Sequence, residues 1–257
     1  MEEKSKTKVA VLASGNGTDL RAIIQAIEEG RLDAEVCLVL SNRRNAGVLH
    51  YTMEQGIPHQ LIPRARGLRL GSTCTKPAAT PAAGTAASAA AAVPVATGAA
   101  SPASAPTTVV ERASAAVAQR QQGPTREEVD RQIHRSLVTA GADLVILVGY
   151  DRILSPMFTR SWMGRCINVH PSLLPEGAGL FDLEVHRSIL ARGREVTGCT
   201  VHLAAEEVDA GAVVLQKRCR VEKGDTPETL KQRVQSLEGE ALVEAVRMFQ
   251  RGELPAG

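Results

Sequence analysis

The fold that this sequence predicts follows from residues 8–30, which read KVAVLASGNGTDLRAIIQAIEEG. Residues 8–13, which are apolar after Lys8, indicate a buried strand, and the glycines that follow indicate a tight turn. Four apolar residues then recur at helical spacing, so they share one face of a helix that Gly30 ends: Leu20, Ile23, Ile24 and Ile27. A buried strand that leads through a glycine turn into a helix is the first unit of an α/β fold.

The same alternation continues along the chain. Apolar runs predict further strands at residues 35–40, 59–62, 143–148, 166–169, 197–203 and 212–221. Helical patterns occupy residues 46–55 and 182–191, the segment that a capping-box spacing opens at Thr125, and a last helix with Asp225 as N-cap and Pro227 in its first turn. Because strands alternate with helices, we expect a doubly wound, mostly parallel, Rossmann-like α/β sheet.

Residues 64–122 interrupt this pattern. Within them, residues 77–106 mix Ala with Pro, Gly, Ser and Thr, and they offer no large side chain that could pack. We expect a disordered surface insert, which costs little stability because the entropy of loop closure grows only logarithmically with length. The sequence therefore predicts one domain, residues 1–63 and 123–257, with an Ala/Pro-rich insert between its two parts.

Composition excludes several classes of function. The net charge is only +2, and one Trp, two Tyr and three Phe are too few to stack bases, so we expect no nucleic-acid partner. No apolar run approaches the roughly 20 residues that cross a bilayer, and the N-terminus lacks a signal-peptide cleavage site, which predicts a cytoplasmic protein without a membrane partner. Five cysteines without a CxxC pair indicate reduced thiols and no metal site.

The glycine turn at residues 14–17 is the first candidate site. Glycines let backbone amides approach an anion at the start of a helix, where the helix dipole favours negative charge. The same residues also fit a tight turn that needs a positive φ, and the sequence leaves both interpretations open. A dinucleotide site is disfavoured, because the third glycine is missing and no acidic residue follows the second strand.

The second and third candidate sites are a strand end and a turn. Asn168 and His170 lie two residues apart on a predicted strand, so both side chains point to the same face. An amide donor beside an imidazole suits acyl transfer to an amine, because the reaction needs a hydrogen bond for the developing oxyanion and a group that accepts a proton. Asp209 lies between two later strands, where it fits either a turn or a carboxylate that orients the histidine.

Five segments carry a resemblance to a known family. They are SGNGTDL (14–20), GYDRILSP (149–156), NVHPSLLP (168–175), TGCTVH (197–202) and EEVDAGAVVLQ (206–216). In order and approximate spacing they resemble the glycinamide ribonucleotide formyltransferases, and NVHPSLLP and VDAG are fairly specific to folate-dependent formyl transferases and their relatives. The resemblance covers the chain except the insert, and GLFDLEVH (179–186) is similar to a variant with extra residues before a helix.

This resemblance implies transfer of a formyl group from 10-formyltetrahydrofolate to a phosphoribosyl amine, glycinamide ribonucleotide, in purine synthesis, by a monomer or a homodimer. It implies that Asn168 holds the formyl oxygen, that His170 accepts and donates the proton, and that Asp209 steers His170 or a water molecule. The residues implied at the folate are Arg152, Ile153, Leu154, Val208 and Asp209. Those implied at the acceptor are Gly15, Asn16, Gly17, Thr18, Asp19 and Glu238.

Three residues depart from the family at the acceptor end. The family usually has Asn at Asp19, Met at Asp151, and a Glu-His pair where this chain has Glu238-Gly239. Two added acids and a lost donor predict poor binding of the ribonucleotide or use of a less anionic amine. The alternative is that Asp19 caps the helix and points away, which leaves the backbone amides to hold the phosphate.

Two other functions stay open at this stage. One is hydrolysis of formyltetrahydrofolate, although relatives with that activity carry an extra N-terminal domain and this sequence begins at its first strand. The other is a folate-binding protein without catalysis, which the complete set of Asn168, His170 and Asp209 disfavours.

Overall fold

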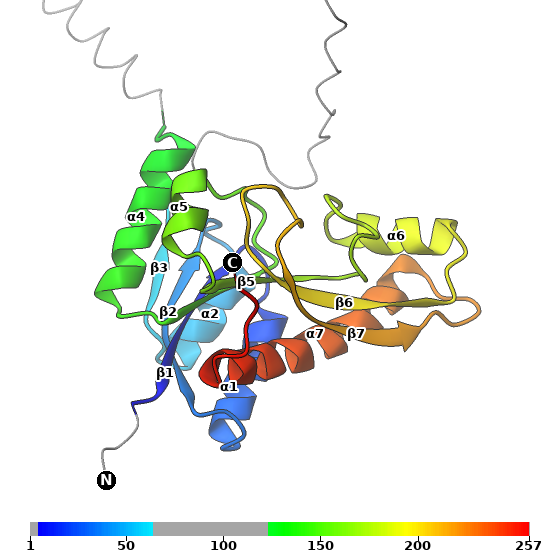
Figure 1. Cartoon of the computed structure of the whole chain (residues 1–257), viewed down its shortest axis with the longest axis horizontal. Helices are drawn as coiled ribbons and strands as arrows, with labels where there is room; N and C mark the ends of the chain where they lie inside the picture. The colour runs from blue at the N-terminus through cyan, green and yellow to red at the C-terminus, as the bar shows by residue number, and fades with distance from the viewer. Residues whose placement is uncertain (1–4, 64–122, 257) are drawn as a thin grey trace, which may run out of the picture. The chain divides into compact units, whose positions relative to one another are not determined.

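The computed structural model describes residues 5–63 and 123–256. In these ranges seven strands form one sheet in the order β3-β2-β1-β4-β5-β6-β7 (Figure 1). The strands through β5 pair in parallel, and β6 and β7 pair antiparallel. Their bounds are Thr7–Ala13, Ala34–Ser41, His59–Leu61, Leu144–Val148, Cys166–His170, Val196–Leu203 and Val213–Arg220. The predicted α/β class with a mostly parallel sheet is confirmed.

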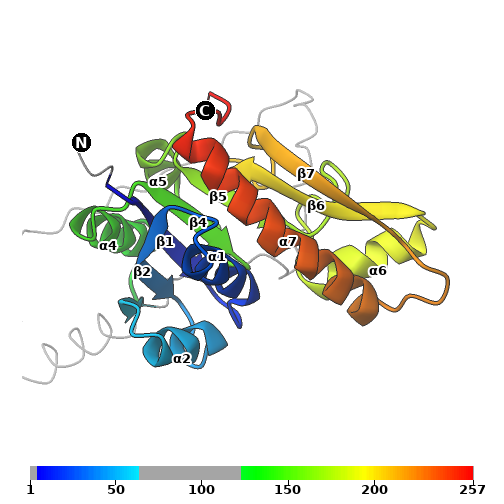
Figure 2. The ribbon, with the colours of Figure 1, turned by 90° about the horizontal axis from the view of Figure 1, so that it is seen from below.

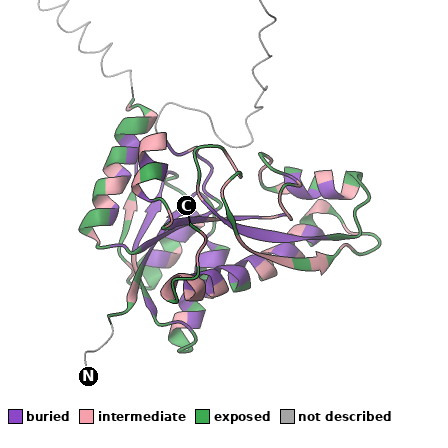
Figure 3. Cartoon of the chain, viewed as in Figure 1, coloured by how far each residue is buried: buried purple, intermediate pink, exposed green. Residues whose placement is uncertain are grey.

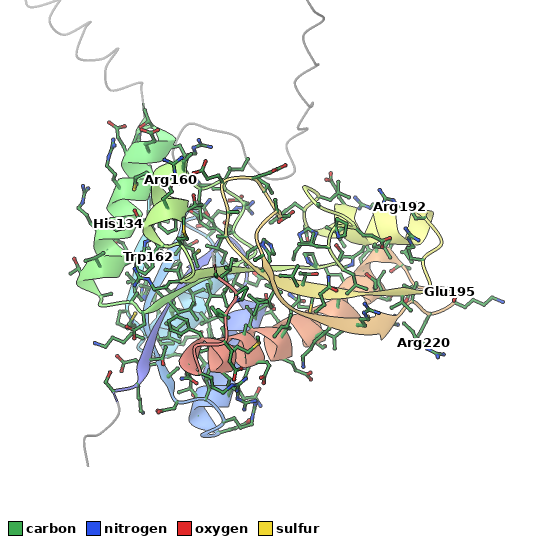
Figure 4. All side chains as sticks on the ribbon, viewed as in Figure 1. His134, Arg160, Trp162, Arg192, Glu195 and Arg220 are labelled. Carbon is green, nitrogen blue, oxygen red and sulfur yellow. The ribbon has the colours of Figure 1, made fainter. Side chains whose placement is uncertain are left out.

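Helices cover both faces of this sheet. They are α1 (Thr18–Glu28), α2 (Gly47–Glu54), α4 (Arg126–Thr139), α5 (Pro156–Ser161), α6 (Leu183–Ala191) and α7 (Pro227–Gln250). Figure 2 shows α7 beside α1 and running alongside β6 and β7, in agreement with the contacts between these elements. Helices α4 and α5 pack on the opposite face, where Trp162 lies edge-on to His134 with ring centroids 6.1 Å apart (Figure 4).

Strand β1 shows why the sheet is buried on both faces. Its residues Val9, Val11 and Ala13 belong to the core under α1 and α7, and the alternate residues Ala10 and Leu12 belong to the core under α4 and α5. All five are fully buried, and the central strands in Figure 3 are almost wholly purple. The continuous apolar run in the sequence thus reflects two cores that share one strand.

The position of β1 also fixes where a ligand can bind. β1 pairs with β2 on one side and with β4 on the other, so the chain crosses over in opposite directions from this point. In an open α/β sheet, a crevice for ligands forms beyond the carboxyl ends of the strands at such a reversal. The glycine turn after β1 lies at this crevice.

Two local predictions need correction. The N-cap of α7 is Thr226, whose side chain accepts the amide of Thr229, whereas the carboxylate of Asp225 accepts hydrogen bonds from Arg233. The short helix α5 was not predicted, because six residues that begin with a proline give too little apolar periodicity. The capping box at Thr125 and Glu128 is present as expected.

The predicted insert, residues 64–122, lies outside the described residues. In the ranges that are described, no helix is both long enough and apolar enough to span a bilayer.

Candidate active site

Two paired strands place four polar side chains on one face of the sheet. Asn168 of β5 lies opposite His202 of β6, and His170 lies opposite Thr200. Because side chains two residues apart on a strand point the same way, the pairing brings Asn168, His170 and His202 together. Asn168 and His202 are 34 residues apart in the sequence, so neither strand shows this site by itself.

Asp209 completes the cluster from the loop between β6 and β7. One carboxylate oxygen lies 3.4 Å from Nδ1 of His170, and the other lies 3.6 Å from Nε2 of His202. The amide of Gly179 donates to the same carboxylate at 2.8 Å. Asp209 has a φ of 57°, a left-handed conformation that Asp tolerates better than most residues. The turn and the histidine contact, which the sequence left as alternatives, therefore occur together.

His202 orients the carboxamide of Asn168. Nδ1 of His202 lies 2.9 Å from the carbonyl oxygen of Leu203, so Nδ1 carries the proton. In this tautomer Nε2 is an acceptor, and Nδ2 of Asn168 lies 3.1 Å from it. One N–H of the Asn168 amide is thus held by His202, and the second is left to bond a ligand.

The electrostatics of the cluster favour a neutral base beside an anion. Burial lowers the pKa of His170 below its ordinary value, and this effect exceeds the opposing effect of Asp209. Burial would raise the pKa of Asp209, but the contacts with His202 and His170 and the amide of Gly179 hold it below its ordinary value. At neutral pH, His170 can therefore accept a proton while Asp209 stays ionised.

Two cavities meet at this cluster. A cavity of about 450 Å³ contains Asn168, His170 and Asp209 in its lining, together with all six residues expected at the acceptor. A second cavity of about 60 Å³ is lined by all five residues expected at the folate: Arg152, Ile153, Leu154, Val208 and Asp209. Asn168 and Asp209 line both. The larger volume is in the range of small-molecule sites.

The acceptor end of the larger cavity begins at the glycine turn. Gly17 is the N-cap of α1 with a φ of 70°, and a Cβ there would lie 2.6 Å from Cγ2 of Val48. A glycine is therefore required both by the backbone and by the close approach of α2. The tight-turn interpretation is correct for Gly17, and it is compatible with an anion site at the start of α1.

Asp19 does not cap this helix. It lies in the first turn and lines the cavity, with 5% of its surface exposed, and its Oδ1 has no hydrogen-bond partner among the described residues. Burial raises the pKa of Asp19 to about 7 against the opposing charge of Lys231. Burial and the charge of Asp19 together raise the pKa of Glu238 well above its ordinary value. The alternative in which Asp19 points away as a cap is wrong.

Asp151 does not act as the second anion that was expected. It is buried and does not line the larger cavity. It accepts hydrogen bonds from Ser14 at 2.9 Å, from Asn42 at 2.6 Å, and from Nε of Arg43 at 3.0 Å. Burial would raise its pKa, but these partners lower it, so an ionised Asp151 is already balanced by Arg43.

The folate side contains a buried arginine. Arg152 is 9% exposed, and its two terminal nitrogens have no hydrogen-bond partner among the described residues. One of them lies 3.6 Å from Asp130 of α4, which is fully buried and accepts the amide of Ser155 at 2.6 Å. Asp130 therefore offsets the charge of Arg152 and leaves its N–H groups available to a ligand.

The formyl transferase family model matches residues 7–246 of this chain. The chain belongs to the formyl transferase family. The predicted family resemblance is thereby confirmed, and the match runs from the first strand of the sheet into α7.

Individual relatives agree with this assignment. The chain is 34% identical to the trifunctional purine biosynthetic protein adenosine-3 of Gallus gallus, over 99% of its own length and 20% of that protein's. It therefore spans about a fifth of that relative. It is 29% identical to the phosphoribosylglycinamide formyltransferase of Escherichia coli (strain K12), over 96% of this chain and 88% of that protein.

Solved structures share the fold. The glycinamide ribonucleotide transformylase 1 of Symbiobacterium toebii superposes with a TM-score of 0.71 at 29% identity, covering 99% of this chain and 92% of that chain. The phosphoribosylglycinamide formyltransferase of Coxiella burnetii gives 0.69 at 30% identity, covering 96% and 88%.

Sequence reasoning missed four residues of the site: Asp130, His202, Lys231 and Arg43. His202 had a usable signal, because it closes the quoted segment TGCTVH and has the same two-residue spacing from Thr200 that separates Asn168 from His170. Arg43 and Lys231 lie in polar stretches where nothing marks one cation among several.

Proposed function

We propose that this chain transfers the formyl group of 10-formyltetrahydrofolate to the primary amine of glycinamide ribonucleotide. The observation that carries the proposal is the shared wall of the two cavities. Asn168 and Asp209 line both, so a formyl donor in one and an amine in the other would meet at His170 and Asn168. Family membership and the names of the relatives support the same reaction.

The chemistry of the smaller cavity fits a folate. Ile153, Leu154 and Val208 offer apolar contacts for a pterin ring, and the N–H groups of Arg152 offer donors for its acceptors. The cavity of about 60 Å³ is narrow, so we expect the loop at residues 204–209 to shift outward when the folate binds.

The side chains at the junction have distinct tasks in this proposal. Bound 10-formyltetrahydrofolate would supply a formyl carbon that is open to attack by an amine. The free N–H of Asn168 donates to the formyl oxygen as negative charge develops there. Neutral His170 accepts the proton that the amine releases as the new carbon–nitrogen bond forms, and it returns that proton to the folate nitrogen as the old bond breaks. Ionised Asp209 stabilises the imidazolium between these two events.

The assay that tests this function follows release of tetrahydrofolate by absorbance, with and without glycinamide ribonucleotide. We expect turnover only when the amine is present. Turnover without any amine would instead indicate a hydrolase. Folate binding without turnover under any condition would indicate a binding protein, and turnover with an uncharged amine alone would indicate a different acceptor.

The setting of the enzyme is part of the same proposal. We infer action in the cytoplasm, in one-carbon metabolism, by a monomer or a homodimer, and a catalytic domain formed by residues 1–63 and 123–257. Light scattering of the purified protein measures its oligomeric state.

A further inference from the structure

Two buried carboxyl groups, Asp19 and Glu238, line the acceptor end of the larger cavity, and we call them the acid pair. Asp19 lies in the first turn of α1 and Glu238 lies on α7. They are 5% and 8% exposed, and Oδ1 of Asp19 has no hydrogen-bond partner among the described residues. Two carboxylates at one buried site cannot both ionise freely, because each disfavours the charge of the other.

The packing of α1 against α7 holds the pair together. A Cβ at Gly239 would lie only 2.5 Å from Cβ of Ala22, so the two helix backbones approach closely at this point. Ala22 lies three residues after Asp19 on α1, and Gly239 follows Glu238 directly on α7. Moving the helices apart to relieve the repulsion of the pair would therefore break this close packing.

Among the titratable groups at this end of the cavity, the acid pair is the one that we expect to change its protonation near neutral pH. The groups that face it are Lys231 on α7, Asp182 and His186 at the start of α6 and on it, Cys199 on β6 and His170 at the end of β5. Burial, helped by Lys231, lowers the pKa of His186 to about 4, and burial raises that of the Cys199 thiol to about 12. Both are then neutral near pH 7. Lys231 is shared, because it also forms an ion pair with Asp182.

The same end of the cavity attracts anions. Helix α1 begins at Gly17, which has no side chain to cap the first amides, and those amides carry the positive end of the helix dipole. A phosphate there would meet attraction from the amides and repulsion from an ionised acid pair. Protonation removes the repulsion and adds a hydroxyl donor.

We propose that the acid pair takes up one proton when the phosphate of the acceptor binds, so that Asp19 makes acceptor binding proton-coupled. The proton comes from solvent and is shared by the two carboxyl groups, and no covalent bond changes. The inference rests on the proposed function, because it assumes an acceptor that carries a phosphate.

Calorimetric titration of the full chain with glycinamide ribonucleotide tests the proposal. At about pH 8, titrations in buffers of different ionisation enthalpy should show uptake of about one proton per acceptor in the wild type and about none in Asp19→Asn. The Kd of the wild type, divided by that of Asp19→Asn, should rise about tenfold per pH unit above neutrality. Because both proteins bind the same ligand, titration of the ligand's own phosphate changes both Kd values equally and cancels in this ratio.

A matched control is Glu240→Gln. Glu240 lies two residues beyond Glu238, its side chain is 66% exposed, and it pairs with Lys217 outside the cavity. Its removal should leave proton uptake unchanged. A wild-type Kd that follows pH no more steeply than that of Asp19→Asn would overturn the proposal.

Ribose 5-phosphate separates this proposal from the proposed function. If glycinamide ribonucleotide fails to bind either protein at any pH, the proposed acceptor is wrong. Binding of ribose 5-phosphate with uptake of about one proton, lost in Asp19→Asn, would still support the acid pair. Binding without uptake, or no binding of either ligand, would refute it.

Discussion

The two ends of the larger cavity differ in how their buried polar groups are satisfied. At the reacting end, the carboxylate of Asp209 has His170 and the amide of Gly179 as partners, and Asn168 is held by His202. At the acceptor end, Oδ1 of Asp19 and Nδ1 of His186 have no hydrogen-bond partner among the described residues. The carboxylate of the reacting end is therefore held before any ligand binds, and Nε2 of His170 is left open to a ligand, whereas at the acceptor end a carboxyl oxygen itself is left for a ligand or a proton to satisfy.

The largest expected effect comes from removal of the base at the reacting end. His170→Ala should lower kcat by about 10²–10⁴-fold, because no other group at the junction accepts the proton of the amine. Folate affinity should change little, since His170 does not line the smaller cavity. Steady-state kinetics and a folate titration measure both quantities. His50→Ala, at an exposed position on α2, is the matched control and should keep full activity.

Smaller effects are expected from Asn168 and from His202, the residue that orients its amide. Asn168→Ala should lower kcat by about 10²–10³-fold, and His202→Phe by about tenfold, because the ring only orients the amide. If the two residues act as one unit, the double variant should be no slower than Asn168→Ala. Multiplied effects would show instead that His202 acts through Asp209.

The arrangement of the elements could be predicted from the sequence because it depends on local patterns. The buried run of β1, the capping box at Thr125 and the spacing of Asn168 and His170 are each visible within a few residues. These patterns fix which face of each element is buried, and parallel pairing then brings the strand ends to one edge.

Long-range charge pairing could not be predicted in the same way. Asp151 was expected to add an anion, but Arg43, 108 residues earlier, lies against it and neutralises it. Gly239 was read as a lost donor, and its position against Ala22 shows a packing role as well. In both cases the deciding partner lies on another element, so only the folded chain identifies it.

Gly239→Ala tests the close contact between α1 and α7 that brings Asp19 and Glu238 of the acid pair together. The added methyl group should lower the free energy of unfolding by about 1–3 kcal/mol through overpacking against Ala22, less up to about 1 kcal/mol of gained helix propensity. Urea denaturation measures the change. The double variant Ala22→Gly/Gly239→Ala swaps the two residues between the helices. It restores the space and leaves the summed helix propensity unchanged, so its free energy of unfolding should return to within about 0.5 kcal/mol of that of the wild type. A destabilised exchange variant would show that the contact is not the cause.

The smallest effect is expected at Asp151, which bonds Ser14 of the glycine turn at the acceptor end. Asp151→Asn keeps the shape but loses the charge that Arg43 and Asn42 bond, which should cost about 1 kcal/mol of unfolding free energy at pH 7. The pKa of Asp151 is lower in the folded chain than in the unfolded one, so its contribution is present above about pH 4 and disappears as the pH falls through the folded value. Urea denaturation across this range should therefore show wild type and variant converging in acid. A difference between wild type and variant that grows on acidification would contradict an ionised Asp151. The control is Glu244→Gln, which removes a half-exposed ion pair on α7 and should change the free energy of unfolding by less than about 0.5 kcal/mol.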